Sequence, residues 1–481
     1  MFSHYRTGAP VSVEVFMSDQ INAEQVFDLS KASQWSSART QHERLPALIC
    51  CQWRFVQINP VTRIKMALSR IFSGRAGNGR ARFFGDQAYH FQTLRALNDI
   101  RADGADTMEV LETIKHIRQG DAQSWFSAWQ KTGERLLQRA VKITDPISRG
   151  QAYLRAHNYL RTAEFFLPPQ DEKRPLSFEK NVKAFGLGLN ALGVQHERIK
   201  APYGQHHLNA IYYPGPAGAD AKALIVFCGG YDSTLEELYF ALVRGAHARG
   251  YNVLTYEGPG QGSVLRDQKL GFTPEWEKPT GAVVDTFLAG HARPPKMVLV
   301  GMSMGGYLAP RAAAFDDRFD GVVAYDVLYD FGEAAERNVP GFVITLHRLG
   351  FEKLVQLLVR IKSYFSPGFA WAVGNGMWVL NTNTAMQTLE ALRAYTLEKV
   401  AAKIKADVLI FAGAHDHFVP VSQAADFERR LTGARSVTTV IYDVESGGAE
   451  HCQLGAQALW HADFFDWMEE KFGRHAWKKV E

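Results

Sequence analysis

The sequence predicts an α/β fold in which a mostly parallel sheet carries helices on both faces, with an all-helical region ahead of it. After Gly193, short apolar runs alternate with helix-compatible stretches, which is typical of parallel sheets. Before it, apolar residues recur at helical spacing, as in Trp125, Trp129 and Leu136. The 481 residues, 46% of them hydrophobic, exceed one ordinary domain.

The predicted sheet begins with a hairpin. Val194–Ile199 and Leu208–Tyr213 flank a turn that contains Pro202 and Gly204. The apolar runs that follow predict six more strands, at Ala223–Cys228, Asn252–Tyr256, Met297–Val300, Gly321–Tyr325, Val408–Phe411 and Val437–Tyr442.

Two helical regions frame this pattern. The stripe around Trp125 and a second one at Tyr153, Ala156 and Tyr159 predict helices ahead of the sheet. An aromatic-rich stretch between the Gly321–Tyr325 and Val408–Phe411 strands interrupts the alternation, which indicates a helical cap. The expected organisation is an N-terminal extension at 1–84, a helical domain at 85–193, the first part of the core at 194–331, the cap at 332–396 and the second part of the core at 397–481.

The clearest chemical motif is Gly301-Met302-Ser303-Met304-Gly305. It directly follows a predicted strand and precedes a helix-compatible run, so the glycines allow a tight turn that exposes the Ser303 hydroxyl. Because this context matches the nucleophile turn of α/β-hydrolases, we expect that fold and expect Ser303 to be the nucleophile.

A serine nucleophile needs a base and an acid that orients it, in the chain order nucleophile, acid, histidine. Asp416 follows a buried strand, and His451 follows the last strand, so they are the expected acid and base. Asp326 and Asp330 are alternative acids. His415 and His417 flank Asp416 and would suit a metal site, but no partner motif accompanies them and we expect no metal.

Two glycine-rich turns complete the expected site. Gly229-Gly230-Tyr231 ends a strand, and the N–H groups of Tyr231 and Met304 are the candidate oxyanion donors. Ser233 and Glu236 predict a capping box for the next helix. The turn 257–262 departs from the dinucleotide pattern GxGxxG and is expected to line the pocket.

Three segments together, Gly229–Thr234, Tyr256–Gly262 and Gly301–Gly306, resemble an α/β-hydrolase subgroup that contains 2,6-dihydroxypseudooxynicotine hydrolase and fungal polyketide-shortening hydrolases. The resemblance covers roughly residues 85 to 475. It implies hydrolysis of a carbon–carbon bond next to a ketone, with esterase activity as the alternative. Relatives usually have glutamate where Asp232 stands, and some have arginine where Met302 stands. Asp232 is therefore expected either to donate a proton to the leaving group or only to shape its turn.

The composition limits the kinds of partner that we expect for this chain. A net charge of +4 gives little support for a nucleic-acid partner, and no apolar run is long enough to span a membrane. Four unevenly placed cysteines and the absence of a signal-like start favour a cytoplasmic enzyme. We expect a small-molecule substrate and no cofactor, and leave a homodimer open. The basic stretch Arg63–Arg82 fits a linker or a membrane- or partner-binding segment.

Acyl transfer or cyclisation in secondary metabolism, thioesterase activity and a non-catalytic binding protein are the competing functions. Analysis of the products formed in isotopically labelled water would distinguish hydrolysis from acyl transfer. Loss of Ser303, Asp416 or His451 would favour the binding protein.

Overall fold

The computed structural model describes residues 82–216, 223–337 and 339–473. The basic stretch before Arg82, Cys50 and Cys51 and nearly all of the expected extension 1–84 lie outside these residues. Among the described helices, none is both long and apolar enough to cross a bilayer.

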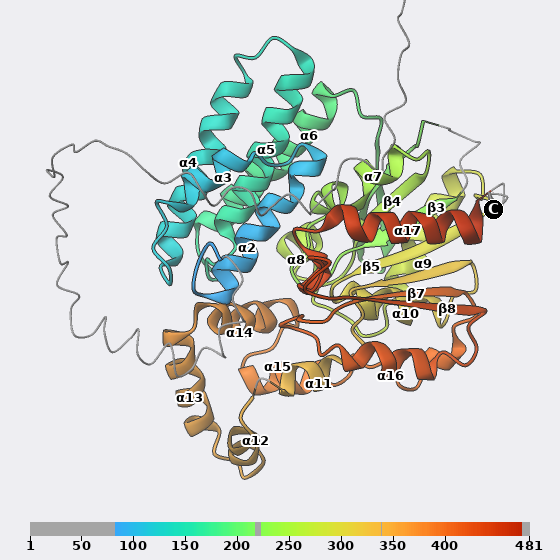
Figure 1. Cartoon of the computed structure of the whole chain (residues 1–481). Coiled ribbons are helices and arrows are strands. Elements are labelled where there is room, and N and C mark those ends of the chain that lie inside the picture. Colours follow the sequence, from blue (N-terminus) through green and yellow to red (C-terminus); the bar gives the residue numbers. More distant parts are fainter. Residues whose placement is uncertain (1–81, 217–222, 338, 474–481) are drawn as a thin grey trace, which may run out of the picture. The chain divides into compact units, whose positions relative to one another are not determined.

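The centre of the fold is an eight-stranded sheet in the order β1-β2-β4-β3-β5-β6-β7-β8 (Figure 1). β1 and β2 form the expected antiparallel hairpin, β2 also pairs antiparallel with β4, and the other neighbours are parallel. The prediction of a mostly parallel sheet is confirmed. The strands are β1 (Glu197–Tyr203), β2 (His206–Tyr213), β3 (Leu224–Cys228), β4 (Asn252–Glu257), β5 (Met297–Met302), β6 (Gly321–Tyr325), β7 (Asp407–Gly413) and β8 (Ser436–Tyr442).

Helices cover both faces of the sheet because alternate strand residues point to opposite sides. Leu224, Val226 and Leu299 pack on one face with α9 and α10, whereas the intervening Ile225 and Val300 pack on the other with α17. Both faces are buried, which explains the continuous apolar runs in the sequence. The helices of the core are α7 (Arg244–His247), α8 (Gly262–Gln268), α9 (Glu277–Gly290), α10 (Gly305–Ala313), α16 (Ser422–Arg430) and α17 (Gln457–Phe472), with a π-helical turn at Tyr239–Val243 before α7.

In the described part of the chain, five α-helices precede the sheet and have a core of their own around Trp125 and Trp129, which are fully buried. Aspartates cap the starts of four of them by accepting backbone N–H groups, and Pro146 opens α5 directly after its cap Asp145. These N-terminal helices are α2 (Gln87–Asn98), α3 (Thr107–Ile114), α4 (Ala122–Ala140), α5 (Pro146–Glu164) and α6 (Lys173–Ala191).

Among the described residues between β6 and β7 there are five more α-helices, and we call them the cap. Both ends of this segment are joined where Asp330 pairs with Thr396. Phe331 N donates to Tyr395 O at 3.0 Å, and Leu397 N donates to Tyr329 O at 2.9 Å. The cap helices are α11 (Phe331–Glu336), α12 (Gly341–Arg348), α13 (Glu352–Phe365), α14 (Pro367–Val379) and α15 (Ala385–Leu392).

Candidate active site

The candidate residues gather at one edge of the sheet. Ser303 follows β5, Asp326 follows β6, Asp416 follows β7 and His451 follows β8. These four strands are parallel neighbours, so their carboxyl ends meet at the same edge, where α/β proteins form their sites.

Ser303 sits on a sharp turn between β5 and α10 with φ 62°, a left-handed conformation that is uncommon for serine. Glycine is required on both sides because of close backbone approaches. A Cβ at Gly301 would lie 1.9 Å from Gly305 O, and one at Gly306 would lie 1.9 Å from Asp326 O. Ser303 N donates to Tyr325 O at 2.7 Å, which ties the turn to the neighbouring strand. The expected glycine-framed turn therefore has a steric cause.

The structure brings Ser303, His451 and Asp416 together. His451 Nε2 is 2.8 Å from Ser303 Oγ, and His451 Nδ1 is 2.5 Å from Asp416 Oδ2. The other carboxylate oxygen of Asp416 accepts the backbone N–H groups of Phe418 at 2.6 Å and Val419 at 3.0 Å. This arrangement fixes both the carboxylate and the imidazole ring.

Electrostatics in this buried group follow from the pairing. Burial alone would lower the pKa of His451, but Asp416 outweighs it and raises that pKa well above its usual range. Burial would likewise raise the pKa of Asp416, but His451 outweighs it and lowers the value. The pair thus favours an ionised Asp416 able to stabilise a protonated imidazole.

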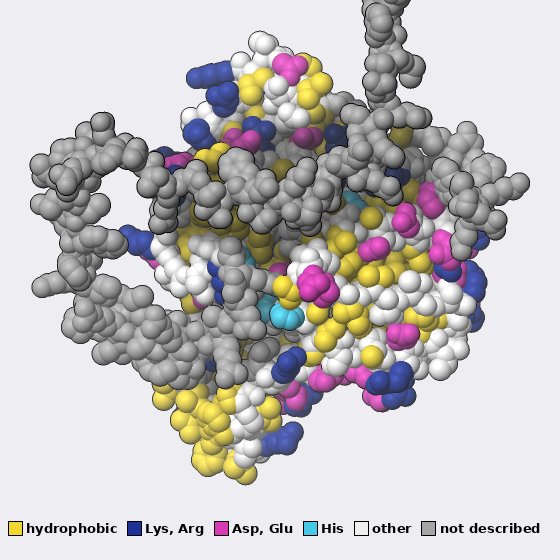
Figure 2. Space-filling view, in the orientation of Figure 1, with side chains coloured by type: hydrophobic (Ala, Val, Ile, Leu, Met, Phe, Trp, Pro, Cys, Tyr) yellow, Lys and Arg dark blue, Asp and Glu magenta, His cyan; other side chains and the backbone are white. Residues whose placement is uncertain are grey.

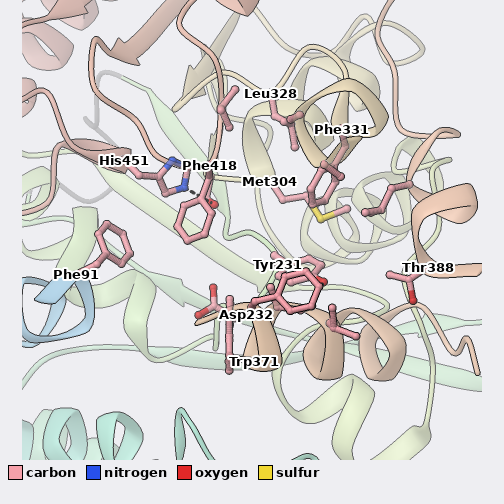
Figure 3. A pocket seen from close by; sticks show the side chains of 18 of the residues that line it. Phe91, Tyr231, Asp232, Met304, Leu328, Phe331, Trp371, Thr388, Phe418 and His451 are labelled. Carbon is pink, nitrogen blue, oxygen red and sulfur yellow. Dashed lines mark hydrogen bonds between the residues drawn. The ribbon is translucent and has the colours of Figure 1, made fainter. Parts of the chain in front are cut away.

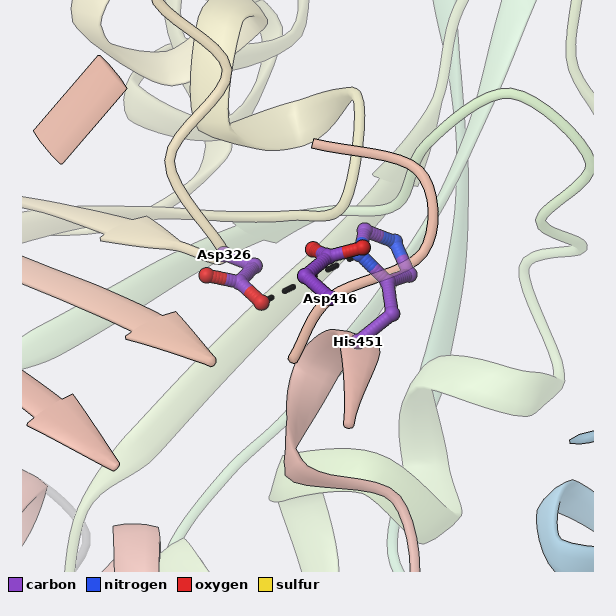
Figure 4. Close-up of side chains that lie close together, drawn as sticks. All are labelled: Asp326, Asp416 and His451. Atoms are coloured by element: carbon purple, nitrogen blue, oxygen red, sulfur yellow. Dashed lines mark hydrogen bonds and ion pairs between the residues drawn. The ribbon is translucent and has the colours of Figure 1, made fainter. Parts of the chain in front are cut away.

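Asp326, weighed as an alternative acid, lies beside this pair (Figure 4). Its Oδ2 is 3.8 Å from His451 Nδ1 and accepts the backbone N–H of Cys452 at 3.1 Å. Burial, followed by repulsion from Asp416, raises the pKa of Asp326 well above its usual range. Asp326 is thus favoured as a neutral acid, and Asp416 makes the direct contact with His451. The other alternative, Asp330, caps α11 by accepting Glu333 N.

Closely spaced carboxylates and imidazoles are the groups that bind metal ions in proteins. Within the described part of the chain, Asp326, Asp416 and His451 form one set whose donor atoms all lie within 4.8 Å. The direct 2.5 Å contact between His451 Nδ1 and Asp416 Oδ2 leaves no space for an ion between those two atoms. The two histidines beside Asp416 do not converge with it: His415 is exposed, and His417 packs against Phe418.

The glycine turn after β3 lies directly against the serine turn. A Cβ at Gly230 would be 2.7 Å from Met304 N and 2.9 Å from Ser303 Cβ. The side-chain amide of Gln261 donates to Gly229 O at 2.9 Å and Gly230 O at 3.0 Å, which holds this turn in place. Because the two turns are in contact, the backbone N–H groups of Tyr231 and Met304 are close enough to bind one oxyanion together.

Two details of the turns differ from expectation. Ser233 Oγ accepts the N–H of Gly230 at 2.9 Å and so closes the turn itself instead of forming a capping box with Glu236. The turn 257–262 does not line the main cavity. It supplies Gln261 as a support, and Gly260 and Gly262 line a small neighbouring cavity. In both cases a side chain bonds across the turn, a contact that spacing alone does not reveal.

Ser303 and His451 line a cavity of about 570 Å³. Figure 3 shows side chains of its wall, with His451 among them. The core contributes Tyr231, Met304 and Phe418 to its wall. The N-terminal helices contribute Phe91 and Arg95, and the cap contributes further apolar groups. Three aromatic residues of the aromatic-rich stretch line the cavity, Phe342, Phe369 and Trp371, whereas Phe351, Tyr364 and Phe365 do not.

One wall of the cavity carries a buried ion-pair network. Arg95, 8% exposed, donates from Nη1 to Asp232 Oδ2 at 2.5 Å. Its Nε and Nη2 donate to the two carboxylate oxygens of Glu237 at 2.6 and 2.7 Å. Burial would raise the pKa of Glu237, but Arg161 and Arg95 outweigh it and lower the pKa to about 2. The N-terminal helices are thereby linked to the core next to Tyr231.

Sequence reasoning missed Arg95 and Glu237. Arg95 is one of 54 basic residues and lies more than a hundred positions from its acidic partners, so no local pattern identifies it. Gln261 could have been suspected, because it lies in a conspicuous glycine-rich turn.

Known proteins resemble this chain along most of its length. Residues 225–456 match the model of the Alpha/beta hydrolase family. Hydrolase acrC of Aspergillus aculeatus is 31% identical over 422 residues, 81% of this chain and 98% of its own length. The 20-hydroxy-prefusarin hydrolase FUS2 of Gibberella moniliformis is 31% identical over 411 residues, 81% of this chain and 97% of its own length.

A solved structure, that of the 2,6-dihydroxy-pseudo-oxynicotine hydrolase, has the same fold. It superposes with a TM-score of 0.62 at 19% identity, covering 78% of this chain and 95% of its own. The strand order, the serine turn and the similarity to known hydrolases all indicate the same family. The chain belongs to the alpha/beta hydrolase family.

Proposed function

We propose that the protein is a serine hydrolase in which Ser303 is the nucleophile, His451 the base and Asp416 the acid that orients it. The observation that carries this proposal is the continuous hydrogen-bonded series from Ser303 Oγ through His451 to Asp416. A serine hydroxyl becomes an effective nucleophile only when a positioned base accepts its proton.

In the proposed reaction, Ser303 Oγ attacks a carbonyl carbon while His451 Nε2 takes its proton. The negative charge that develops on the carbonyl oxygen is bound by the N–H groups of Tyr231 and Met304. Each such donor typically contributes about a hundred- to a thousandfold in rate. Collapse of the adduct expels the leaving group and leaves an acyl-serine, which water cleaves with His451 again acting as base.

For the substrate we propose a β-diketone or polyketide-like compound with a large apolar or aromatic body. The cavity supports this choice by its size and by its wall of Tyr231, Phe418 and Trp371. The resemblance to carbon–carbon bond hydrolases points the same way. When the carbon–carbon bond breaks, its electron pair passes to the carbon next to the remaining ketone. The imidazolium of His451 then protonates this enolate.

We assign Asp232 a positioning role for Arg95 in place of proton donation. Its contact with the Arg95 guanidinium supports this choice, because an ion-paired carboxylate accepts hydrogen bonds. Asp232→Asn should then slow activated esters and diketones to a similar extent. Selective loss of diketone cleavage would instead identify Asp232 as the proton donor.

Ester hydrolysis is the second candidate, because the same three residues could cleave an ester whose leaving oxygen is readily protonated. A panel of β-diketones and esters, analysed by mass spectrometry in labelled water, distinguishes the two activities. Diketone cleavage with one labelled oxygen in the acid product supports the first candidate. Turnover of esters alone supports the second.

The nucleophile is tested separately with Ser303→Ala and a fluorophosphonate probe. We expect the wild type to be labelled at Ser303 and the variant to be unlabelled, inactive and folded. Ser233→Ala is the control for labelling: its hydroxyl lies nearby but closes the glycine turn, so the probe should still label Ser303 in this variant. Full activity of Ser303→Ala, or labelling at another residue, would contradict the proposal.

A further inference from the structure

The cap carries an exposed apolar face that the proposed chemistry does not use. Figure 2 shows hydrophobic side chains gathered over the cap, at α12 and α13. Scattered exposed apolar residues are ordinary, but a contiguous group this large usually marks an interaction surface. Six large side chains, each at least 43% exposed, define the cap face: Phe342, Leu349, Phe351, Leu354, Leu357 and Ile361.

The spacing of three of these residues gives α13 an apolar side that faces outward. Leu354, Leu357 and Ile361 recur at intervals of three and four, so they share one side of the helix. Val355 on the inner side is fully buried. The helix therefore has two apolar sides, of which the inner one suffices to pack the cap.

Basic residues border the cap face. Arg348, Lys353 and Arg360 are exposed, and Lys353 and Arg360 are seven residues apart and so lie along one side of α13. Between residues 341 and 365 the single acidic residue is Glu352, which contacts His347. An apolar stripe bordered by Lys and Arg is the pattern of helices that lie in the interface of an anionic membrane.

A second copy of this chain fits the same face less well. A twofold contact would bring the cap face against itself and place these like charges near one another. An anionic lipid surface would accept both the apolar side chains and the surrounding cations.

The cavity reaches the cap face. Phe342 and Ile361 line the cavity and are also 59% and 43% exposed, so the same side chains belong to both surfaces. An apolar compound dissolved in a bilayer would meet the cavity at this point without crossing water.

We propose that the cap face docks on an anionic lipid surface and turns the opening of the cavity toward it. The docking goes beyond the proposed function and does not depend on it. The supply of apolar substrate from the bilayer does rest on that function.

Vesicle sedimentation of the full chain tests the docking. We expect the wild type to sediment with phosphatidylcholine vesicles that contain phosphatidylglycerol, and more weakly with pure phosphatidylcholine. Leu354→Glu/Leu357→Glu should abolish sedimentation, and neither residue lines the cavity. The matched control is Val141→Glu/Ile147→Glu, which adds the same charges at exposed apolar positions of the N-terminal region and should bind as the wild type does.

Charge is tested with Lys353→Gln/Arg360→Gln. Each basic residue near an anionic surface contributes roughly fivefold in binding, so the double variant should bind phosphatidylglycerol vesicles about 25-fold more weakly. Its weaker binding to pure phosphatidylcholine should change little. Equal loss on both vesicles would contradict the electrostatic part of the argument.

Ester turnover without vesicles separates this proposal from the catalytic one. Leu354→Glu/Leu357→Glu should retain turnover of a water-soluble ester while losing vesicle binding. Failure of the wild type to bind vesicles, or unchanged binding by this variant, would overturn the docking. A lipid-free dimer that the same variant dissociates in analytical ultracentrifugation would overturn it too, and would assign the cap face to a second copy.

Discussion

Replacing Arg95 by methionine tests how the N-terminal helices are attached to the core. The change removes three charge-assisted hydrogen bonds and leaves Glu237, 5% exposed, without its main partner. Breaking a buried ion pair from one side typically costs about 3–5 kcal/mol of unfolding free energy. Since Arg161 remains 3.6 Å from Glu237, we expect the lower part of that range, about 3–4 kcal/mol.

The assay is urea denaturation followed by tryptophan fluorescence, with a companion variant that removes the stranded charge. The double variant Arg95→Met/Glu237→Gln should recover part of the lost unfolding free energy. The coupling energy between the two positions should be about 1 kcal/mol or more. Arg118→Met is the control, because its ion pair with Asp121 is surface-exposed and should contribute about 0–1 kcal/mol. A loss for Arg95→Met no larger than that of Arg118→Met would refute the reasoning.

Two further predictions concern buried carboxyl groups. Asp416→Asn should lower kcat by about 10⁴ through the wrong imidazole tautomer. Asp326→Asn should lower kcat much less, because Asn resembles the neutral acid. Both values are measured with an activated ester. A larger loss for Asp326→Asn than for Asp416→Asn would make Asp326 the orienting acid. Burial, the largest influence, raises the pKa of Asp99 to about 7. The native state thus keeps a proton that the unfolded chain releases near pH 4, and stability falls as the pH rises from about 4 to 7. Asp99→Asn should flatten this part of the stability curve, and an unchanged slope would exclude the effect.

The sequence predicts the sheet well because buried parallel strands and the turns after them leave local patterns. All eight expected strands lie where the structure has them, with ends that differ by a few residues. The positions of Ser303, Asp416 and His451 after their strands are local facts of the same kind. Their closeness in space follows from the order of β5, β6, β7 and β8 in the sheet, which only the structure gives.

What the sequence does not reveal depends on contacts between distant segments. Arg95 meets Asp232 across 137 positions, and no pattern near either residue signals it. Asp326 could be placed at the end of its strand, yet its approach to His451 depends on how the chain turns at Cys452, where φ is 51°. The wrong capping box at Ser233 has a similar cause, since a hydroxyl in a tight turn has more than one backbone N–H within reach.

The two ends of the cap meet at Asp330 and Thr396, and this closure bears on how new specificities could arise. Because the segment leaves and rejoins the sheet at one place, lengthening it changes the entropy of loop closure only slowly. A different set of helices could be grafted onto the same two residues while β6 and β7 keep their pairing. The scaffold thus permits the cap's share of the cavity wall to be exchanged as a single genetic unit. A new cap would have to replace the carbonyl of Ala372, which accepts a hydrogen bond from the Tyr231 hydroxyl at 3.1 Å.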